Sequence, residues 1–75
     1  MSDTTAKILC EISGNNLARG VLLDYRGSHR LDYYEAYRLV KGVFDCCGVD
    51  CDTECLTTDW DTVAAYINSM EAANV

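Results

Sequence analysis

Hydrophobic and polar residues alternate along the first part of the chain. In "AKILCEIS" (6–13) every second residue is apolar, which is typical of a strand with one buried face. The turn-favouring residues "GNN" follow, and "LARGVLLDYR" then supplies a second apolar run with Val21, Leu23 and Tyr25 on one side. The pattern therefore predicts a β-hairpin over residues 5–26.

The period of the apolar residues changes from two to about 3.6 after the loop sequence "RGSHR". A helix is predicted over 32–47, because apolar residues recur there every three or four positions. Asp32 and Glu35 form a capping-box pattern at its start, and Gly48 fits the position just after its end. The same spacing predicts a second helix over 59–71.

Alternation returns between these helices. Residues 50–57, "DCDTECLT", place cysteine and threonine on one side and carboxylates on the other, which predicts a third, short strand. The predicted order is ββαβα. We therefore expect an α+β fold, in which a three-stranded, mainly antiparallel sheet in the order 2-1-3 carries two helices packed on one face. At 75 residues the chain is expected to form a single domain, 1–75, with a thin core.

Charge is distributed unevenly along the chain. Residues 1–41 hold six basic and five acidic side chains, a net charge of +1. Residues 42–75 hold seven acidic side chains and no lysine or arginine, a net charge of −7. This sign disfavours direct binding of nucleic acid and of anionic membrane surfaces. A basic protein surface is the expected partner.

The acidic stretch is the main candidate for a binding site. On a strand, Asp50, Asp52 and Glu54 would project from one face at intervals of about 6.6–7 Å. Such a row could copy a run of phosphates and occupy a basic groove, although simple solvation explains it equally well. Other side chains are predicted to extend the contact: Asp45, Asp59 and Asp61 at its ends, and Tyr34 as an aromatic anchor on a neighbouring face.

Four cysteines within ten residues raise the question of a metal site. Cys46, Cys47, Cys51 and Cys55 match the ligand count of structural zinc, but zinc sites usually join two separated cysteine pairs. Alternation turns Cys51 and Cys55 inward on the predicted strand, where free cysteine packs as a small hydrophobe. We therefore predict core packing and no metal or other cofactor.

Calcium binding is also disfavoured. The segment "DCDTECLTTDWD" places acids at positions 1, 3, 5 and 12 of an EF-hand-like register. Cys55 replaces the glycine that the sharp turn needs, and Asp61 replaces the usual bidentate glutamate. The register therefore lacks two of its defining residues.

No catalytic pattern accompanies these residues. His29 is the only histidine and lies in a predicted loop, and the five glycines form no phosphate-binding loop. The polar start "MSDTTAK" and the short apolar run after it fit neither a signal peptide nor a membrane span. We expect a non-enzymatic, cytoplasmic protein with reduced cysteines, present as a monomer or homodimer.

In size and acidity the whole chain resembles the small inhibitors that phages encode against host defence or transcription, anti-CRISPR proteins among them. The resemblance implies a protein of the host cytoplasm that occludes a basic surface of a nucleic-acid-handling host protein. Two other classes stay open: a small metal-binding or redox module built on the four clustered cysteines, and a structural oligomerisation subunit that uses a helix face.

Overall fold

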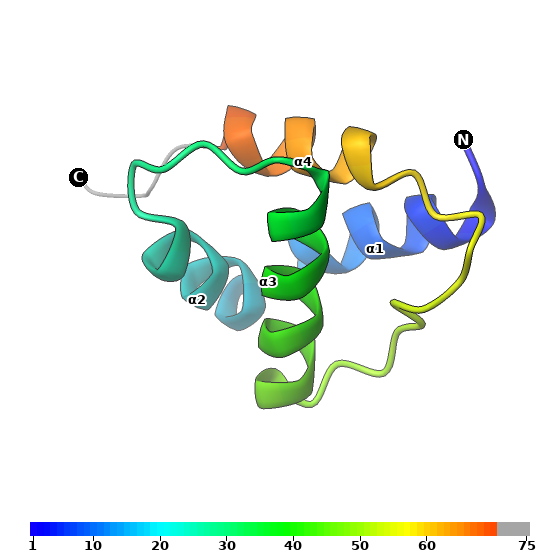
Figure 1. Cartoon of the computed structure of the whole chain (residues 1–75). Helices are drawn as coiled ribbons and strands as arrows, with labels where there is room; N and C mark the ends of the chain where they lie inside the picture. The colour runs from blue at the N-terminus through cyan, green and yellow to red at the C-terminus, as the bar shows by residue number, and fades with distance from the viewer. Residues whose placement is uncertain (71–75) are drawn as a thin grey trace.

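The computed structural model describes residues 1–70, and this part of the chain folds into four helices. They are α1 (Asp3–Gly14), α2 (Asn16–Arg26), α3 (Tyr33–Cys47) and α4 (Trp60–Ser69). Each helix packs on the next, and α4 returns to α1, so the four close into a ring. Figure 1 shows α3 lying across α4, and the loop 48–59 running along the outside from the end of α3 to the start of α4.

The β-hairpin predicted for residues 5–26 is wrong, because this region forms α1 and α2. The side chains that become buried are four residues apart, Ile8 with Ile12 and Ala18 with Leu22, as one side of a helix requires. Ile8 and Ile12 also fit a period of two, so the alternation in "AKILCEIS" was compatible with both structures. Tyr25, predicted to face inward, is 73% exposed.

Asn15 explains why two helices replace the hairpin turn. Its N–H donates to the Glu11 carbonyl at the end of α1, and its Oδ1 accepts from the Ala18 N–H at 3.1 Å at the start of α2. One residue with an extended backbone therefore caps both helices. At the other end of α1, the Ser2 hydroxyl accepts from the Thr5 N–H.

The third strand predicted for 50–57 is also wrong, and with it the α+β class, the sheet order 2-1-3 and the packing of two helices on one sheet face. Residues 1–70 contain no strand, and 48–59 form an irregular loop. A strand needs neighbouring strands to pair its backbone groups, and the two proposed neighbours are helices. The alternation of exposure survives, because an extended loop still turns successive side chains to opposite sides: Asp50, Asp52 and Glu54 are exposed, whereas Cys51, Thr53 and Cys55 are not.

The two predicted helices are present. Asp32 and Glu35 form the reciprocal capping box at the start of α3, and Gly48 ends it with a left-handed backbone at φ 69°. Asp59 caps α4. The structure shows α4 as far as Ser69, and the predicted last residue, Glu71, lies outside the described residues.

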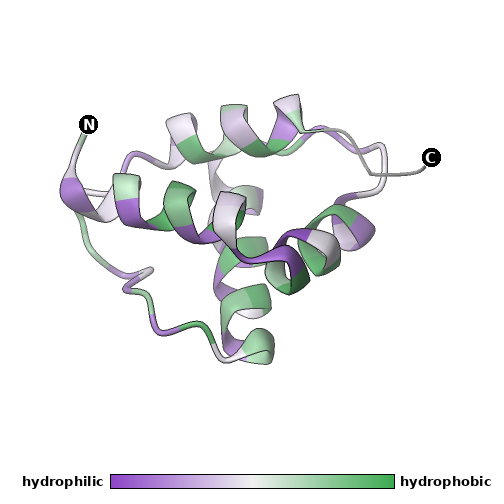
Figure 2. Ribbon diagram, turned by 180° about the vertical axis from the view of Figure 1, so that it is seen from behind, coloured by the Kyte–Doolittle hydropathy of each residue, from purple (hydrophilic) through white to green (hydrophobic). Residues whose placement is uncertain are grey.

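Apolar stripes of the four helices meet in one core (Figure 2). Its largest fully buried apolar side chains are Ile8, Ile12, Leu22, Val40, Val63 and Ile67. Leu31, just before α3, is buried too, and its N–H and C=O bond the Asn68 side chain at 2.9 and 2.8 Å. Among the helices described, none has the length and apolar composition that crossing a bilayer requires.

The helical assignment of the first third can be tested at Leu22. This side chain is 1% exposed, so Leu22→Ala should lower the free energy of unfolding by about 2–5 kcal/mol. Urea denaturation followed by circular dichroism measures the effect. Leu17→Ala on the same helix is the control, because Leu17 is 65% exposed and its truncation should cost less than about 0.5 kcal/mol. Equal losses for the two variants would contradict the burial pattern.

Candidate protein-binding surface

Glu54 fastens the loop 48–59 to α3. One oxygen of its carboxylate accepts from the Tyr37 hydroxyl at 2.7 Å and from the Lys41 ammonium at 2.5 Å. Tyr37 and Lys41 lie one helical turn apart on α3, so they present both donors on the same side. We call these three residues the loop anchor.

Electrostatics of the loop anchor favour its charged form at neutral pH. The hydrogen bonds from Lys41 and then from Tyr37 lower the pKa of the Glu54 carboxyl. The same carboxylate raises the pKa of Lys41 and the pKa of Tyr37. All three groups are solvated, so the anchor orders the loop more than it stabilises the whole fold.

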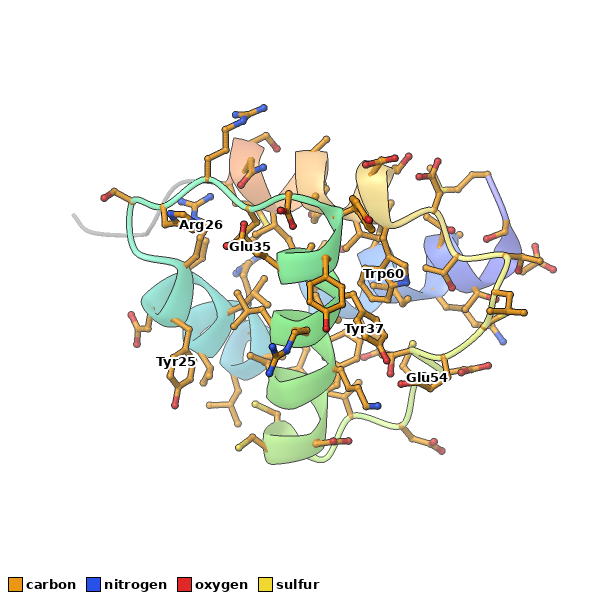
Figure 3. The ribbon with its side chains drawn as sticks, in the orientation of Figure 1. Tyr25, Arg26, Glu35, Tyr37, Glu54 and Trp60 are labelled. Atoms are coloured by element: carbon orange, nitrogen blue, oxygen red, sulfur yellow. The ribbon has the colours of Figure 1, made fainter. Side chains whose placement is uncertain are left out.

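Aromatic side chains gather beside the anchor. The Tyr37 ring meets the Trp60 ring edge to face at a centroid distance of 5.4 Å (Figure 3), and the Tyr34 ring lies 6.3 Å from that of Tyr37. Together with Tyr33 and Leu56 these rings line a depression of about 300 Å³. We call Tyr33, Tyr34, Tyr37, Leu56 and Trp60 the aromatic surface.

Much of the aromatic surface is open to solvent. Leu56 is fully exposed at the turn of the loop, Tyr33 is 59% exposed and Tyr34 is 54% exposed. Arg38 lies over the Tyr34 ring at 5.9 Å from its centroid. Large side chains that remain exposed together in so small a protein mark a contact surface more often than isolated ones do.

The predicted site residues do not form one row. Tyr34 and Glu54 line the same depression, and Asp59 and Asp61 flank Trp60 at the start of α4. The other three lie elsewhere: Asp50 and Asp52 border a different depression beside Lys7 of α1, and Asp45 is in the last turn of α3.

Several of these carboxylates have structural partners, which corrects the picture of an unneutralised charge row. Glu54 is paired with Lys41, a residue from the other half of the chain. Asp59 accepts from the Thr62 N–H and hydroxyl, and Asp52 accepts from the Glu54 N–H at 2.8 Å. Residues 50–57 form no strand, and Asp50 and Asp52 border one depression while Glu54 lines another.

Sequence reasoning missed four members of the aromatic surface: Tyr33, Tyr37, Leu56 and Trp60. The three aromatic residues recur with the apolar positions of their helices, a pattern that predicts burial, but Tyr33 is exposed and Trp60 is only partly buried. Leu56 falls within the strand predicted over 50–57.

The five cysteines are unpaired. Cys47 and Cys51 pack against the core, as predicted, whereas Cys46 is exposed and Cys55 borders the aromatic surface. Within residues 1–70, no three cysteine, histidine or carboxylate side chains gather closely enough to hold a metal ion. The geometry therefore gives the metal-module alternative no support.

Comparison with known proteins adds no family. No family model matches the chain, and neither a curated protein nor a solved structure matches it.

The loop anchor should respond to acid and to alkali. Because the pKa of Glu54 is lowered, the stabilisation that Glu54 gives to the anchored loop is complete above the ordinary glutamate pKa of about 4.3. This stabilisation is lost as the pH falls through the lowered value. Because the pKa values of Lys41 and Tyr37 are raised, their contribution is lost only as the pH rises above about 10. Amide exchange in 48–59 and Trp60 fluorescence should report a loosened loop below about pH 4.

Asp59 also has a lowered pKa, because the Thr62 hydroxyl and amide donate to it, so the acid transition contains two groups. The acid transition measured in Asp59→Asn, a variant that keeps a capping oxygen, therefore reports on Glu54 without the contribution of Asp59. Adding Glu54→Gln should then remove the acid step in the loop. An unchanged step in the double variant would show that Glu54 does not hold the loop.

The thiols of Cys51 and Cys55 should differ in reactivity. Hydrogen bonds from the Thr4 and Thr57 hydroxyls lower the pKa of the Cys55 thiol, whereas burial, followed by the Glu11 carboxylate, raises that of Cys51. Since the thiolate is the nucleophile, iodoacetamide near pH 7.5 should alkylate Cys55 faster than Cys51. Cleavage at the acidic residues between them separates the two for mass spectrometry. Labelling in urea should remove the difference, and faster labelling of folded Cys51 would contradict it.

Proposed function

We propose that this protein is a non-enzymatic binding protein whose aromatic surface, bordered by carboxylates, docks on a basic protein surface. The observation that carries the proposal is the group of exposed rings and Leu56 around one depression at the anchored loop. Tyrosine and tryptophan are the residues that most often dominate binding energy at protein interfaces.

The loop anchor supports this use of the surface. Binding costs less free energy when the contact residues are already ordered. Glu54 holds the loop that carries Leu56, and the Thr5 hydroxyl accepts from the Asp59 N–H at 2.8 Å at the loop's end. Leu56 is thereby presented between two fixed points.

Charge defines the class of partner. Asp59 and Asp61, the neighbours of Trp60 in sequence, take part in none of the ion pairs of residues 1–70, whereas the nearby cations Lys41 and Arg38 already contact Glu54 and the Tyr34 ring. A partner that presents lysine and arginine around an apolar patch would complement this rim and would be attracted at long range. Basic surfaces of this kind serve nucleic-acid binding, so we propose that the protein occludes such a surface in the manner of a phage-encoded inhibitor.

The proposal of a non-enzymatic role rests on the surroundings of the reactive groups. His29 is paired with Glu35 at 3.1 Å on the surface, where the same carboxyl group caps α3. Cys55, the thiol with the lowered pKa, borders a different depression from His29. A cysteine–histidine pair, which nucleophilic catalysis would use, is therefore not assembled in the described residues.

Capture of partners from a host lysate, followed by affinity measurement, tests the proposal. Tyr34→Ala and Leu56→Ser each remove an exposed anchor and should weaken binding about tenfold or more. Asp61→Asn should weaken it less, mainly through a slower association that added salt masks. The captured protein should lose nucleic-acid binding when the complex forms.

A matched control uses α2. Leu17→Ala and Asp24→Asn change an exposed apolar residue and an exposed carboxylate away from the aromatic surface, and both should bind as the native protein does. Binding that survives loss of Tyr34 and Leu56 but fails in the α2 variants would overturn the assignment. A partner whose nucleic-acid binding is unaffected would refute occlusion while leaving the surface assigned.

A further inference from the structure

A second depression, of about 270 Å³, lies between α2 and α3, away from the aromatic surface. Its walls are mostly apolar, and Tyr25 stands out at its edge with 73% of its surface exposed (Figure 3). The residues that line it are Val21, Tyr25, Arg38, Leu39, Gly42, Val43 and Cys46.

The α3 side of this groove contains features that a lone chain does not explain. Gly42 is inside the helix, where glycine costs about 1 kcal/mol relative to alanine. A Cβ placed there would meet nothing within 4 Å, so packing within the chain does not require the glycine. Asp45 is in the last turn of α3, where the helix dipole disfavours a negative charge.

Arg38 is the third residue on this part of α3, after Gly42 and Asp45, that a lone chain does not explain. Its guanidinium lies over Tyr34, and among residues 1–70 the ion pairs involve other residues, Lys41 with Glu54 and His29 with Glu35. Arg38 and Asp45 are seven positions apart, on the same side of α3 but about 10 Å apart along its axis. They are therefore too far apart to pair within one helix and are placed to meet opposite charges from outside.

These positions are self-complementary about Gly42. Arg38 lies about 6 Å before Gly42 along the axis and Asp45 about 4.5 Å after it, both rotated to the same side by about 40–60°. A two-fold axis perpendicular to α3 can place the α3 of a second copy antiparallel to the first, with the two Gly42 residues facing each other. Under this rotation each residue stays on the same lateral side of the helix pair, and its position along the helix axis is mirrored about Gly42. Arg38 then faces Asp45 of the second copy within about 1.5 Å of axial offset, and the pair occurs twice.

The opposite side of the same stripe matches as well. Leu39 lies about 4.5 Å before Gly42 and Cys46 about 6 Å after it, both rotated toward the α2 side. The same operation places Leu39 against Cys46 of the second copy, next to the apolar walls of the groove. Glycine at the centre lets the two backbones approach closely, since helix axes otherwise stay about 8–10 Å apart.

We infer that the α2–α3 groove is a homodimer interface, in which two copies pack their α3 helices antiparallel across Gly42 with Arg38 paired to Asp45 of the other copy. A second copy fits this groove better than an unrelated helix, because it supplies the carboxylate, the thiol and the glycine at the matching heights. The glycine and the aspartate that are unfavourable in the monomer then become contacts.

Charge reversal tests the pairing in the full-length protein under reducing conditions. Sedimentation of the native chain over a concentration series should show a shift from 8.3 kDa to twice that mass. Arg38→Asp and Asp45→Arg each place like charges together and should weaken dimerisation about tenfold or more. The double variant restores opposite charges and should recover native dimerisation within about threefold. Arg30→Asp, in an exposed loop, is the control and should leave it unchanged.

Cross-linking tests the register independently of these charges. Under oxidation, Leu39→Cys should form a disulfide with Cys46 of the second copy, and Leu39→Cys/Cys46→Ser should not. The two Cys46 residues are about 12 Å apart along the axis in this arrangement, so the native chain should not cross-link through them. A native chain that stays monomeric at millimolar concentration would overturn the proposal. So would a double charge variant as weak as either single one.

Discussion

The carboxylate of Glu54 is the contact on which the candidate surface depends. The segment between α3 and α4 has no secondary structure of its own. The hydrophobic core of so short a chain is small and can bury few side chains of this loop. By accepting from Tyr37 and Lys41, Glu54 ties this loop to the helix that crosses the middle of the molecule (Figure 1). Leu56 and Trp60 are in turn placed beside the tyrosines of α3.

Helix α3 consequently organises both surfaces of the protein. The side that carries Tyr34 and Tyr37 faces the loop and forms the aromatic surface. The side that carries Leu39 and Gly42 faces the groove next to α2. Residues between these sides, such as Val40, are fully buried in the core. Tyr34 and Arg38, which are in contact, stand at the border of the two surfaces.

Local signals in the sequence were sufficient for α3 and α4. Asp32, Glu35 and Gly48 mark the ends of α3, and Asp59 caps α4 close to the predicted start. Such caps depend only on residues a few positions apart, so no knowledge of the tertiary structure is needed to find them. The prediction for the first third of the chain was wrong because Ile8 and Ile12 fit the period of a strand and that of a helix equally well.

The candidate site was only partly predictable. The sequence correctly indicated that Asp50, Asp52 and Glu54 would be exposed, since alternation of exposure needs only an extended backbone. It could not indicate that Lys41 pairs with Glu54, because the two are thirteen positions apart and the contact depends on the path of the irregular loop that begins after α3. Exposure of Leu56 depends on the same path.

The buried hydroxyl of Thr5 links the two ends of the fold into one cooperative unit. Thr5 is fully buried in the first turn of α1, and it accepts from the backbone N–H of Asp59, the residue that caps α4. Fraying at the start of α1 would therefore leave a donor at the start of α4 without its partner, at a cost in free energy. These two segments, 54 positions apart in sequence, are therefore expected to unfold together. This bond adds to the packing of α1 on α4, which closes the ring of helices.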